Sequence, residues 1–153
     1  MGEFFQEGTR KVVMALVEQS SVIPFNRGPE GLKVILITAR GDGSWIVPKG
    51  HLEPDMTPAE SAEKEALEEA GVTGRLYPDP VFEYEFELGG DTIRVEMFLL
   101  EVDTMLDDWD EKSMRERRHV GLEEAVELVP FADLKKALRQ LPEFLEQADK
   151  EKK

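Results

Sequence analysis

Residues 50–72 read GHLEPDMTPAESAEKEALEEAGV, and this stretch decides the fold more than any other part of the chain. The letters TPAE at 57–60 combine the spacing of a capping box with proline at the first helical position, so we expect a helix to begin here. It is predicted to run to about Ala70, because Gly71 follows where a left-handed terminating residue is favoured. We therefore expect a loop, a helix and a second loop, and call residues 50–72 the box segment.

Three carboxylates share one side of this helix. Glu65, Glu68 and Glu69 stand at positions i, i+3 and i+4, so they lie on one arc of the helical surface. Alone they repel one another, and by charge patterning such a stretch is typical of a solvated acidic face. A divalent cation turns the repulsion into coordination, because Mg²⁺ prefers carboxylate oxygens. Whether this helix carries a metal site or only a solvated acidic face therefore depends on what surrounds it.

Apolar runs on either side of the box segment predict strands. Residues 11–18 (KVVMALVE) and 33–38 (KVILIT) are rich in β-branched residues, and the segment between them contains the turn formers Pro24, Asn26, Gly28, Pro29 and Gly31. We expect two strands joined by a loop. After the turn at 40–44 and Trp45-Ile46-Val47, the letters PKG at 48–50 predict irregular backbone.

The carboxyl-terminal half predicts a hairpin followed by helices. Residues 81–88 and 92–102 flank Gly89-Gly90-Asp91, and Phe82, Tyr84, Phe86 and Leu88 alternate onto one face. Residues 103–119 are polar, which predicts a long functional loop. Short helices are expected at 122–128 and over 133–147, the second bent near Pro142. Strands interrupted by helices favour an α/β or α+β fold with a mixed sheet.

Length and composition indicate one globular domain. The 153 residues suit a single domain at 1–147 with a frayed tail at 148–153, and the hydrophobic fraction of 41% includes no run long enough to cross a membrane. Without cysteines or a recognisable signal peptide, we expect a cytoplasmic protein. The net charge of −14 disfavours a long polynucleotide partner but permits a small anionic substrate where a metal and local cations offset the acidic groups.

The box segment resembles the signature of the Nudix hydrolases. That pattern has Gly, five residues, Glu, seven residues, then Arg-Glu-aliphatic-any-Glu-Glu-any-Gly-aliphatic. The matching positions are Gly50, Glu65, Glu68, Glu69, Gly71 and Val72. Met56 replaces the first Glu and Lys64 replaces the Arg. A thioether is a poor ligand for Mg²⁺, and lysine lacks the planar fork that fixes a carboxylate. Glu53 and Asp55 are candidates to compensate.

The resemblance implies a fold and a chemistry. The fold is the Nudix α/β/α sandwich with a central mixed sheet. The cofactor is Mg²⁺ or Mn²⁺, held by Glu65 and Glu69 with a contribution from Glu68 and completed by the backbone carbonyl of Lys49. The reaction is attack of a metal-activated water on phosphorus, with the bridging oxygen of the diphosphate as the leaving group. All three glutamates are then catalytic, and we nominate Glu68 as the general base.

The resemblance extends over residues 10–130 to the diphosphoinositol-polyphosphate and diadenosine-polyphosphate hydrolase branch. The matching stretches are WIVPKGHLEP (45–54), the strand that carries Arg94, LDDWDEKSMRERR (106–118) and LEEAVEL (122–128). The PKGH sequence departs from the inositol type and is closer to hydrolases of asymmetric dinucleoside polyphosphates, so both substrates stay open. Phosphate contacts are expected from Lys49, His51, Arg94, Arg115 and Arg117, with Arg10 and Lys11 as further candidates.

Each of these assignments has a plainer alternative. The charged cluster at 114–119 is also typical of a solvated loop, and His51 of a hydrogen bond at the start of a helix. Trp45 and Trp109 are candidates for stacking on a base or for core packing, and His119 is taken as structural.

Three functions follow as hypotheses. The first is Mg²⁺-dependent hydrolysis of a dinucleoside polyphosphate or a diphosphoinositol polyphosphate, with nucleoside diphosphate derivatives as a wider class. The second, motivated by Met56 and Lys64, is a polyphosphate-binding module without catalysis. The third is removal of the 5′ pyrophosphate from RNA, which the net charge disfavours. We expect a small phosphorylated substrate, no membrane, and a monomer or homodimer.

Overall fold

A mixed sheet of eight strands organises residues 15–151, the part of the chain that the computed structural model describes. The strand order is β3-β2-β1-β7-β5, with β4 paired to β1, β6 to β7 and β8 to β2. The two long central strands, β1 and β7, run parallel, and every other pair is antiparallel. The strands are β1 Leu16–Gly28, β2 Gly31–Thr38, β3 Trp45–Ile46, β4 Lys49–His51, β5 Val72–Leu76, β6 Phe82–Leu88, β7 Asp91–Met105 and β8 Arg117–Gly121.

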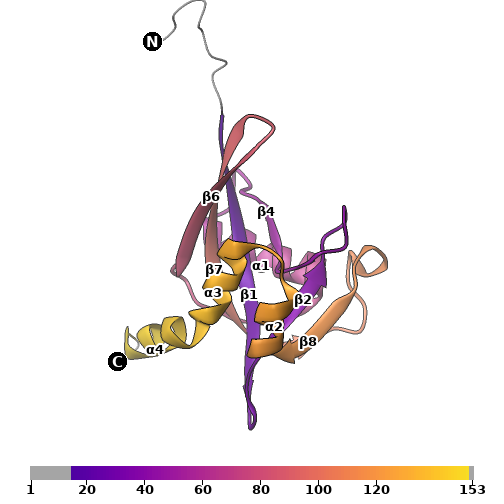
Figure 1. Cartoon of the computed structure of the whole chain (residues 1–153), viewed down its shortest axis with the longest axis vertical. Coiled ribbons are helices and arrows are strands. Elements are labelled where there is room, and N and C mark those ends of the chain that lie inside the picture. Colours follow the sequence, from indigo (N-terminus) through magenta and orange to yellow (C-terminus); the bar gives the residue numbers. More distant parts are fainter. Residues whose placement is uncertain (1–14, 152–153) are drawn as a thin grey trace, which may run out of the picture.

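Helices cover both faces of the sheet, as Figure 1 shows, with α2, α3 and α4 in front of the strands and α1 behind them. The helices are α1 Pro58–Glu65, its π-helical continuation η1 Ala66–Ala70, a 3₁₀ turn η2 Lys112–Met114, α2 Leu122–Leu128, α3 Ala132–Arg139 and α4 Leu141–Glu151. The predicted α/β/α sandwich with a central mixed sheet is confirmed.

Alternation along the central strands builds two separate cores. On β1, Val22 faces the core under α1 and Ile23 faces the core under α2–α4, and on β7 Phe98 and Leu99 divide in the same way. The helix of the box segment, α1 with its continuation η1, is called the box helix. It presents Ala62, Ala66 and Ala70 to the sheet, all fully buried. Small side chains let the helix backbone approach the strands closely, and this brings the carboxylates on its flank near the ends of β4 and β8.

Two predicted irregular segments are instead part of the sheet. The sequence predicts a loop around Pro24 and Asn26, but β1 continues through both as far as Gly28. Pro24 is tolerated because it lies between the β4 partner of β1, at residues 19–21, and the β2 partner, which starts at Phe25. The prediction of irregular backbone at 48–50 is also wrong for Lys49 and Gly50. These two residues pair with β1 as part of β4.

The long loop predicted at 103–119 is shorter in the structure. β7 extends to Met105, and Arg117 and His119 belong to β8, which pairs with β2. The predicted hairpin of β6 and β7 is confirmed, and the register ends at the Leu88–Asp91 pair. The loop that remains, residues 106–116, crosses the carboxyl-terminal end of the box helix. We call residues 106–116 the crossing loop.

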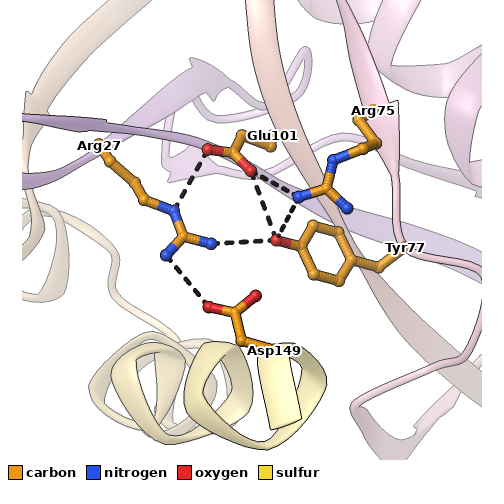
Figure 2. A network of polar contacts seen from close by, with 5 residues as sticks. All are labelled: Arg27, Arg75, Tyr77, Glu101 and Asp149. Carbon is orange, nitrogen blue, oxygen red and sulfur yellow. Dashed lines mark hydrogen bonds and ion pairs between the residues drawn. The ribbon is translucent and has the colours of Figure 1, made fainter. Parts of the chain in front are cut away.

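The last helices extend beyond the predicted end of the domain. The chain bends at Gln140, not at Pro142, and Pro142 lies in the first turn of α4, where its missing N–H costs nothing. A frayed tail is predicted from residue 148, yet α4 continues to Glu151. Asp149 accepts a hydrogen bond from Arg27 at 3.3 Å, and Figure 2 shows how this guanidinium joins α4 to Glu101 on the sheet.

Strand β5 is absent from the sequence prediction and depends on one glycine. A Cβ at Gly74 would lie 2.0 Å from the backbone carbonyl oxygen of Glu101, at the point where the β5–β7 register shifts. Backbone cannot move aside as a side chain does. We expect Gly74→Ala to lower the free energy of unfolding by about 2 kcal/mol or more. Urea denaturation measures this, with Gly41→Ala as control because a Cβ there meets nothing within 4 Å. An equal effect of the two substitutions would contradict the packing argument.

Among residues 15–151, no helix combines the length with the apolar composition needed to cross a bilayer.

Candidate active site

The box helix begins as the sequence predicts and ends differently. The side chain of Thr57 accepts a hydrogen bond from the Glu60 N–H at 3.1 Å, and the Glu60 carboxylate accepts one from the Thr57 N–H at 2.9 Å. Gly71 terminates the helix with φ of 65°. The last turn, Ala66–Ala70, is a π-helix, which the sequence does not predict. Such turns are rare and occur often at functional sites, and this one carries Glu68 and Glu69.

Glu65 and Glu69 form a buried pair of carboxyl groups. Their residues are 8% and 6% exposed. Glu65 lies against Gly50 so closely that a Cβ on the glycine would be 2.2 Å from Glu65 Oε2. Glu69 accepts a hydrogen bond from the backbone N–H of Lys49 at 3.1 Å and pairs with Arg115 at 3.4 Å. The two carboxyl groups of the helix therefore lie against the backbone of the loop at Lys49 and Gly50.

The electrostatics of this pair fit a divalent cation. Burial raises the pKa of Glu69 to about 8, against the opposing influence of Arg115 and of the Lys49 N–H. Burial likewise raises the pKa of Glu65, and each of the two carboxyl groups affects the pKa of the other. Two buried carboxyl groups that lie close together supply the negatively charged oxygen ligands that Mg²⁺ and Mn²⁺ prefer. A cation stabilises their ionised forms, which burial alone disfavours.

Glu68 lies at the more exposed end of the same arc. Lys64 pairs with Glu68 at 3.0 Å and with Glu53 at 3.5 Å, so Glu53, a candidate to replace the missing Glu at Met56, is held by a lysine. One carboxylate oxygen each from Glu68, Asp110 and Glu111 lies within 4.8 Å of the others. Sequence reasoning missed Asp110 and Glu111, although the acidic run 107–111 marks them.

The crossing loop, together with Arg117 at the start of β8, satisfies the carbonyl groups at the end of the box helix one after another. The backbone N–H of Glu111 donates to the Glu68 carbonyl at 3.0 Å, and the indole N–H of Trp109 donates to the Glu69 carbonyl at 3.1 Å. Arg117 donates to the Ala70 carbonyl at 2.8 Å, and the Leu106 N–H donates to that of Gly71 at 2.8 Å. These are the groups that a helix end leaves without intrahelical partners. The loop thus fixes the π-helical turn that carries the carboxylates.

Arg117 is a structural clamp in this geometry. Its guanidinium also donates to the Leu106 carbonyl at 3.0 Å and stacks 4.0 Å from the centre of the Trp109 ring. We expect Arg117→Met to lower the free energy of unfolding by about 2–3 kcal/mol, because buried carbonyls lose a charged donor.

Arg118→Met is the matched control, since the neighbouring guanidinium is exposed and pairs with Glu124 on the surface. Urea denaturation distinguishes the two variants. If Arg117→Met keeps its full stability and only raises the KM for substrate, the guanidinium is a phosphate ligand as the resemblance implies, and the clamp is refuted.

The structure distributes the other predicted phosphate contacts unevenly. Arg115 is in the site, but its side chain is 7% exposed and also pairs with Glu111 at 2.9 Å. His51 is exposed on β4. Arg94 pairs with Glu18, Glu83 and Glu85 at 3.1 to 3.6 Å. Arg10 and Lys11 lie outside the described residues, and their role stays a prediction.

Lys49 connects the carboxylates to a pocket of about 350 Å³. Its backbone N–H binds Glu69, while its ammonium lies 5.0 Å from the centre of the Phe86 ring in the wall of the pocket. The tryptophans lie elsewhere: Trp109 is covered by Arg117, and Trp45 packs against the core with Arg118 over its ring. His119 contacts Asn26 at 2.9 Å, in agreement with a structural role.

Comparison with known proteins identifies the family. The NUDIX domain model matches residues 17–147. Nudix hydrolase 12, mitochondrial, of Arabidopsis thaliana is 35% identical over 75% of this chain and 61% of its own length. Diphosphoinositol polyphosphate phosphohydrolase 3-alpha of Mus musculus is 30% identical over 73% of this chain and 68% of its own. The chain thus spans about three fifths of the first plant relatives.

Solved structures agree on the fold. The Ap4A hydrolase of C. elegans superposes with a TM-score of 0.71 over 85% of this chain and 98% of its own, at 22% identity. Its binary complex gives a TM-score of 0.72 over 86% of this chain. The matching family model, together with the capped box helix, the buried carboxyl pair and the sandwich architecture, shows that the chain belongs to the Nudix family.

Proposed function

We propose that this protein is a pyrophosphohydrolase that uses Mg²⁺ or Mn²⁺ to cleave a phosphoanhydride bond in a small phosphorylated molecule. The observation that carries the proposal is the buried Glu65–Glu69 pair at the junction of the glycine loop and the box helix. A folded protein gains no stability from two carboxyl groups pressed together away from water. Such a pair on a family signature supports a metal-binding role.

The proposed division of labour follows the contacts. Glu65 and Glu69 would hold the cation together with the backbone carbonyl of Lys49, a residue whose N–H donates a hydrogen bond to Glu69 at 3.1 Å. Bound in this position, a divalent cation lowers the pKa of water and offsets phosphate charge. Arg115 fixes the orientation of Glu69 through its ion pair, because its guanidinium is also tied to the Thr38 carbonyl at 3.0 Å. It is therefore a positioning residue in this proposal.

Glu68 is proposed to remove a proton from the attacking water. Glu68 is less buried than Glu65 and Glu69. Among the described residues, it is the one Glu of the triad that forms an ion pair with Lys64. A general base must reach the attacking water, and its exposure makes Glu68 the accessible carboxylate of the three. Water adds to phosphorus, the bridging oxygen leaves with one phosphate group, and the proton passes to the carboxylate.

The substrate class expected from the sequence carries over as part of the proposal. The mouse relative is named for diphosphoinositol polyphosphate and the nematode structure for Ap4A, so both classes stay in the panel of substrates to be tested. The cytoplasmic location also stays a prediction, because the first plant relatives are named mitochondrial.

A substrate screen tests the proposal. Purified protein with Mg²⁺ or Mn²⁺ is incubated with diadenosine tetraphosphate, a diphosphoinositol polyphosphate, a nucleoside diphosphate sugar and 5′-triphosphorylated RNA, and the products are separated by anion-exchange chromatography. We expect cleavage of at least one small molecule, and no cleavage in EDTA. Ligand-induced thermal stabilisation without product from any substrate would favour the non-catalytic binding module. Preferred turnover of the RNA would favour the third hypothesis.

A further inference from the structure

The last turn of the box helix is hydrogen-bonded from outside at the residues that carry its carboxylates. The main-chain carbonyl of Glu68 accepts from the Glu111 N–H at 3.0 Å, and that of Glu69 accepts from the indole N–H of Trp109 at 3.1 Å. Both donors belong to one short stretch of the crossing loop, residues 109–111. The backbone position of two carboxylate residues therefore depends on a segment about 40 positions away in the sequence.

Close contacts hold the Trp109 ring in one place. Gly71 lies so near that a Cβ on it would be 2.6 Å from indole Cδ2. The Arg117 guanidinium lies 4.0 Å from the centre of the ring, and a cation over an aromatic ring stabilises the packing of both groups. The ring cannot tilt without disturbing one of these contacts. Its N–H is therefore a donor in a fixed position, directed at the Glu69 carbonyl.

The π-helical turn needs such external support. Its terminal N–H, from Gly71, is shared between the carbonyls of Ala66 and Leu67, five and four residues earlier, so the turn combines the π and α hydrogen-bond patterns. Glu69 is buried, and a buried carbonyl that loses its donor is costly to leave unpaired. Without the indole N–H, the turn is free to rewind toward the α pattern. Rewinding changes the direction in which the Glu69 side chain leaves the helix.

Glu69 is thus held at both ends. Its carboxylate is bound by the Lys49 N–H at 3.1 Å and by Arg115 at 3.4 Å, and its main chain is bound by Trp109. We propose that Trp109 is a positioning residue, whose indole N–H fixes the backbone of Glu69 and thereby the geometry with which Glu65 and Glu69 bind a divalent cation. The inference rests on the metal-dependent function proposed above and is independent of which substrate is cleaved.

Replacing a single N–H group tests the proposal without changing the packing. Benzothienylalanine has the bicyclic shape of tryptophan but carries sulfur in place of the indole N–H, and it is introduced at position 109. The same replacement at Trp45 is the control, because that ring packs against the core and its N–H makes no hydrogen bond within residues 15–151. The Kd for Mn²⁺, measured by electron paramagnetic resonance of the free ion, should rise about fivefold at position 109, as for one lost hydrogen bond. It should not change at position 45.

Turnover at saturating Mn²⁺ supplies the second measurement. With the small molecule that the screen above identifies, the Trp109 replacement should lower kcat about tenfold and leave KM unchanged, because ligand geometry is altered and no substrate contact is lost.

The possible results separate this proposal from the proposed function. A lower melting temperature with wild-type Kd for Mn²⁺ and wild-type kcat would show that Trp109 only stabilises the fold, and the positioning role would be overturned. An equal effect of the replacement at Trp45 would overturn it too. If the Kd for Mn²⁺ depends on the Trp109 N–H but the wild type cleaves no anhydride, the hydrolase function fails and the positioning role stands. A wild type that binds no Mn²⁺ would refute both.

Discussion

Replacing Glu69 with glutamine is expected to lower kcat by about a thousandfold while the protein stays folded. The amide oxygen still accepts the hydrogen bond from the Lys49 N–H, and the side chain keeps its volume, so the packing of the box helix is preserved. What is lost is an anionic oxygen donor, and an amide is a far weaker ligand for Mg²⁺ than a carboxylate.

The stability of this variant follows from the burial of Glu69. Burial raises the pKa of this carboxyl to about 8, so the position tolerates a neutral side chain in place of the carboxylate. Substitution by a neutral amide therefore introduces no new charge burial, and the melting temperature should change little. Glu63→Gln, on the exposed side of the same helix, is the control for loss of a negative charge. If Glu69→Gln retained more than about a tenth of wild-type kcat, Glu69 would not be a ligand essential to the reaction.

Gly50→Ala is the second substitution with a large expected effect. The added Cβ would lie 2.2 Å from Glu65 Oε2 and 2.9 Å from Oε1, so the carboxylate must leave its position. Glu65 itself is intact in this variant, and only its placement changes. A misplacement of this size in a metal ligand is expected to lower kcat/KM about a hundredfold.

Two measurements distinguish displacement from unfolding. The affinity for Mn²⁺, followed by electron paramagnetic resonance of the free ion, should fall together with kcat/KM, while circular dichroism stays that of the wild type. Gly41→Ala, on an exposed turn where a Cβ meets nothing within 4 Å, is the control. Full activity of Gly50→Ala with unchanged Mn²⁺ affinity would show that the observed position of Glu65 is irrelevant to the chemistry.

The sequence predicts those elements whose signals are local. The capping box at Thr57, the stop at Gly71 and the Gly89-Gly90 hairpin are each set by neighbouring residues, and all three are confirmed. The errors arise where pairing is decided at a distance. β1 continues through Pro24 because β7 runs parallel to it over ten residue pairs, from Leu16–Thr92 to Phe25–Glu101. Strand β5 exists because Gly74 permits β7 to approach.

The site divides in the same way. The spacing of Glu65, Glu68 and Glu69 on one helix is readable from the sequence, and the structure places the first and last in contact. The crossing loop is not readable, because its bonds to the helix end join residues about 40 positions apart, as for Trp109 and Glu69. The acidic partners of Arg94 come from β1 and β6, and only the folded sheet brings them to this guanidinium.

The central claim is that Glu65 and Glu69 together hold a divalent cation. A crystal soaked in Mn²⁺ and measured at the manganese absorption edge tests it most directly, because anomalous scattering locates the ion without reference to activity. We predict a strong anomalous peak between the carboxylates of Glu65 and Glu69, beside the Lys49 carbonyl, and no such peak in Glu69→Gln. A wild-type map with no peak there, or with manganese bound only at other carboxylates, would contradict the account.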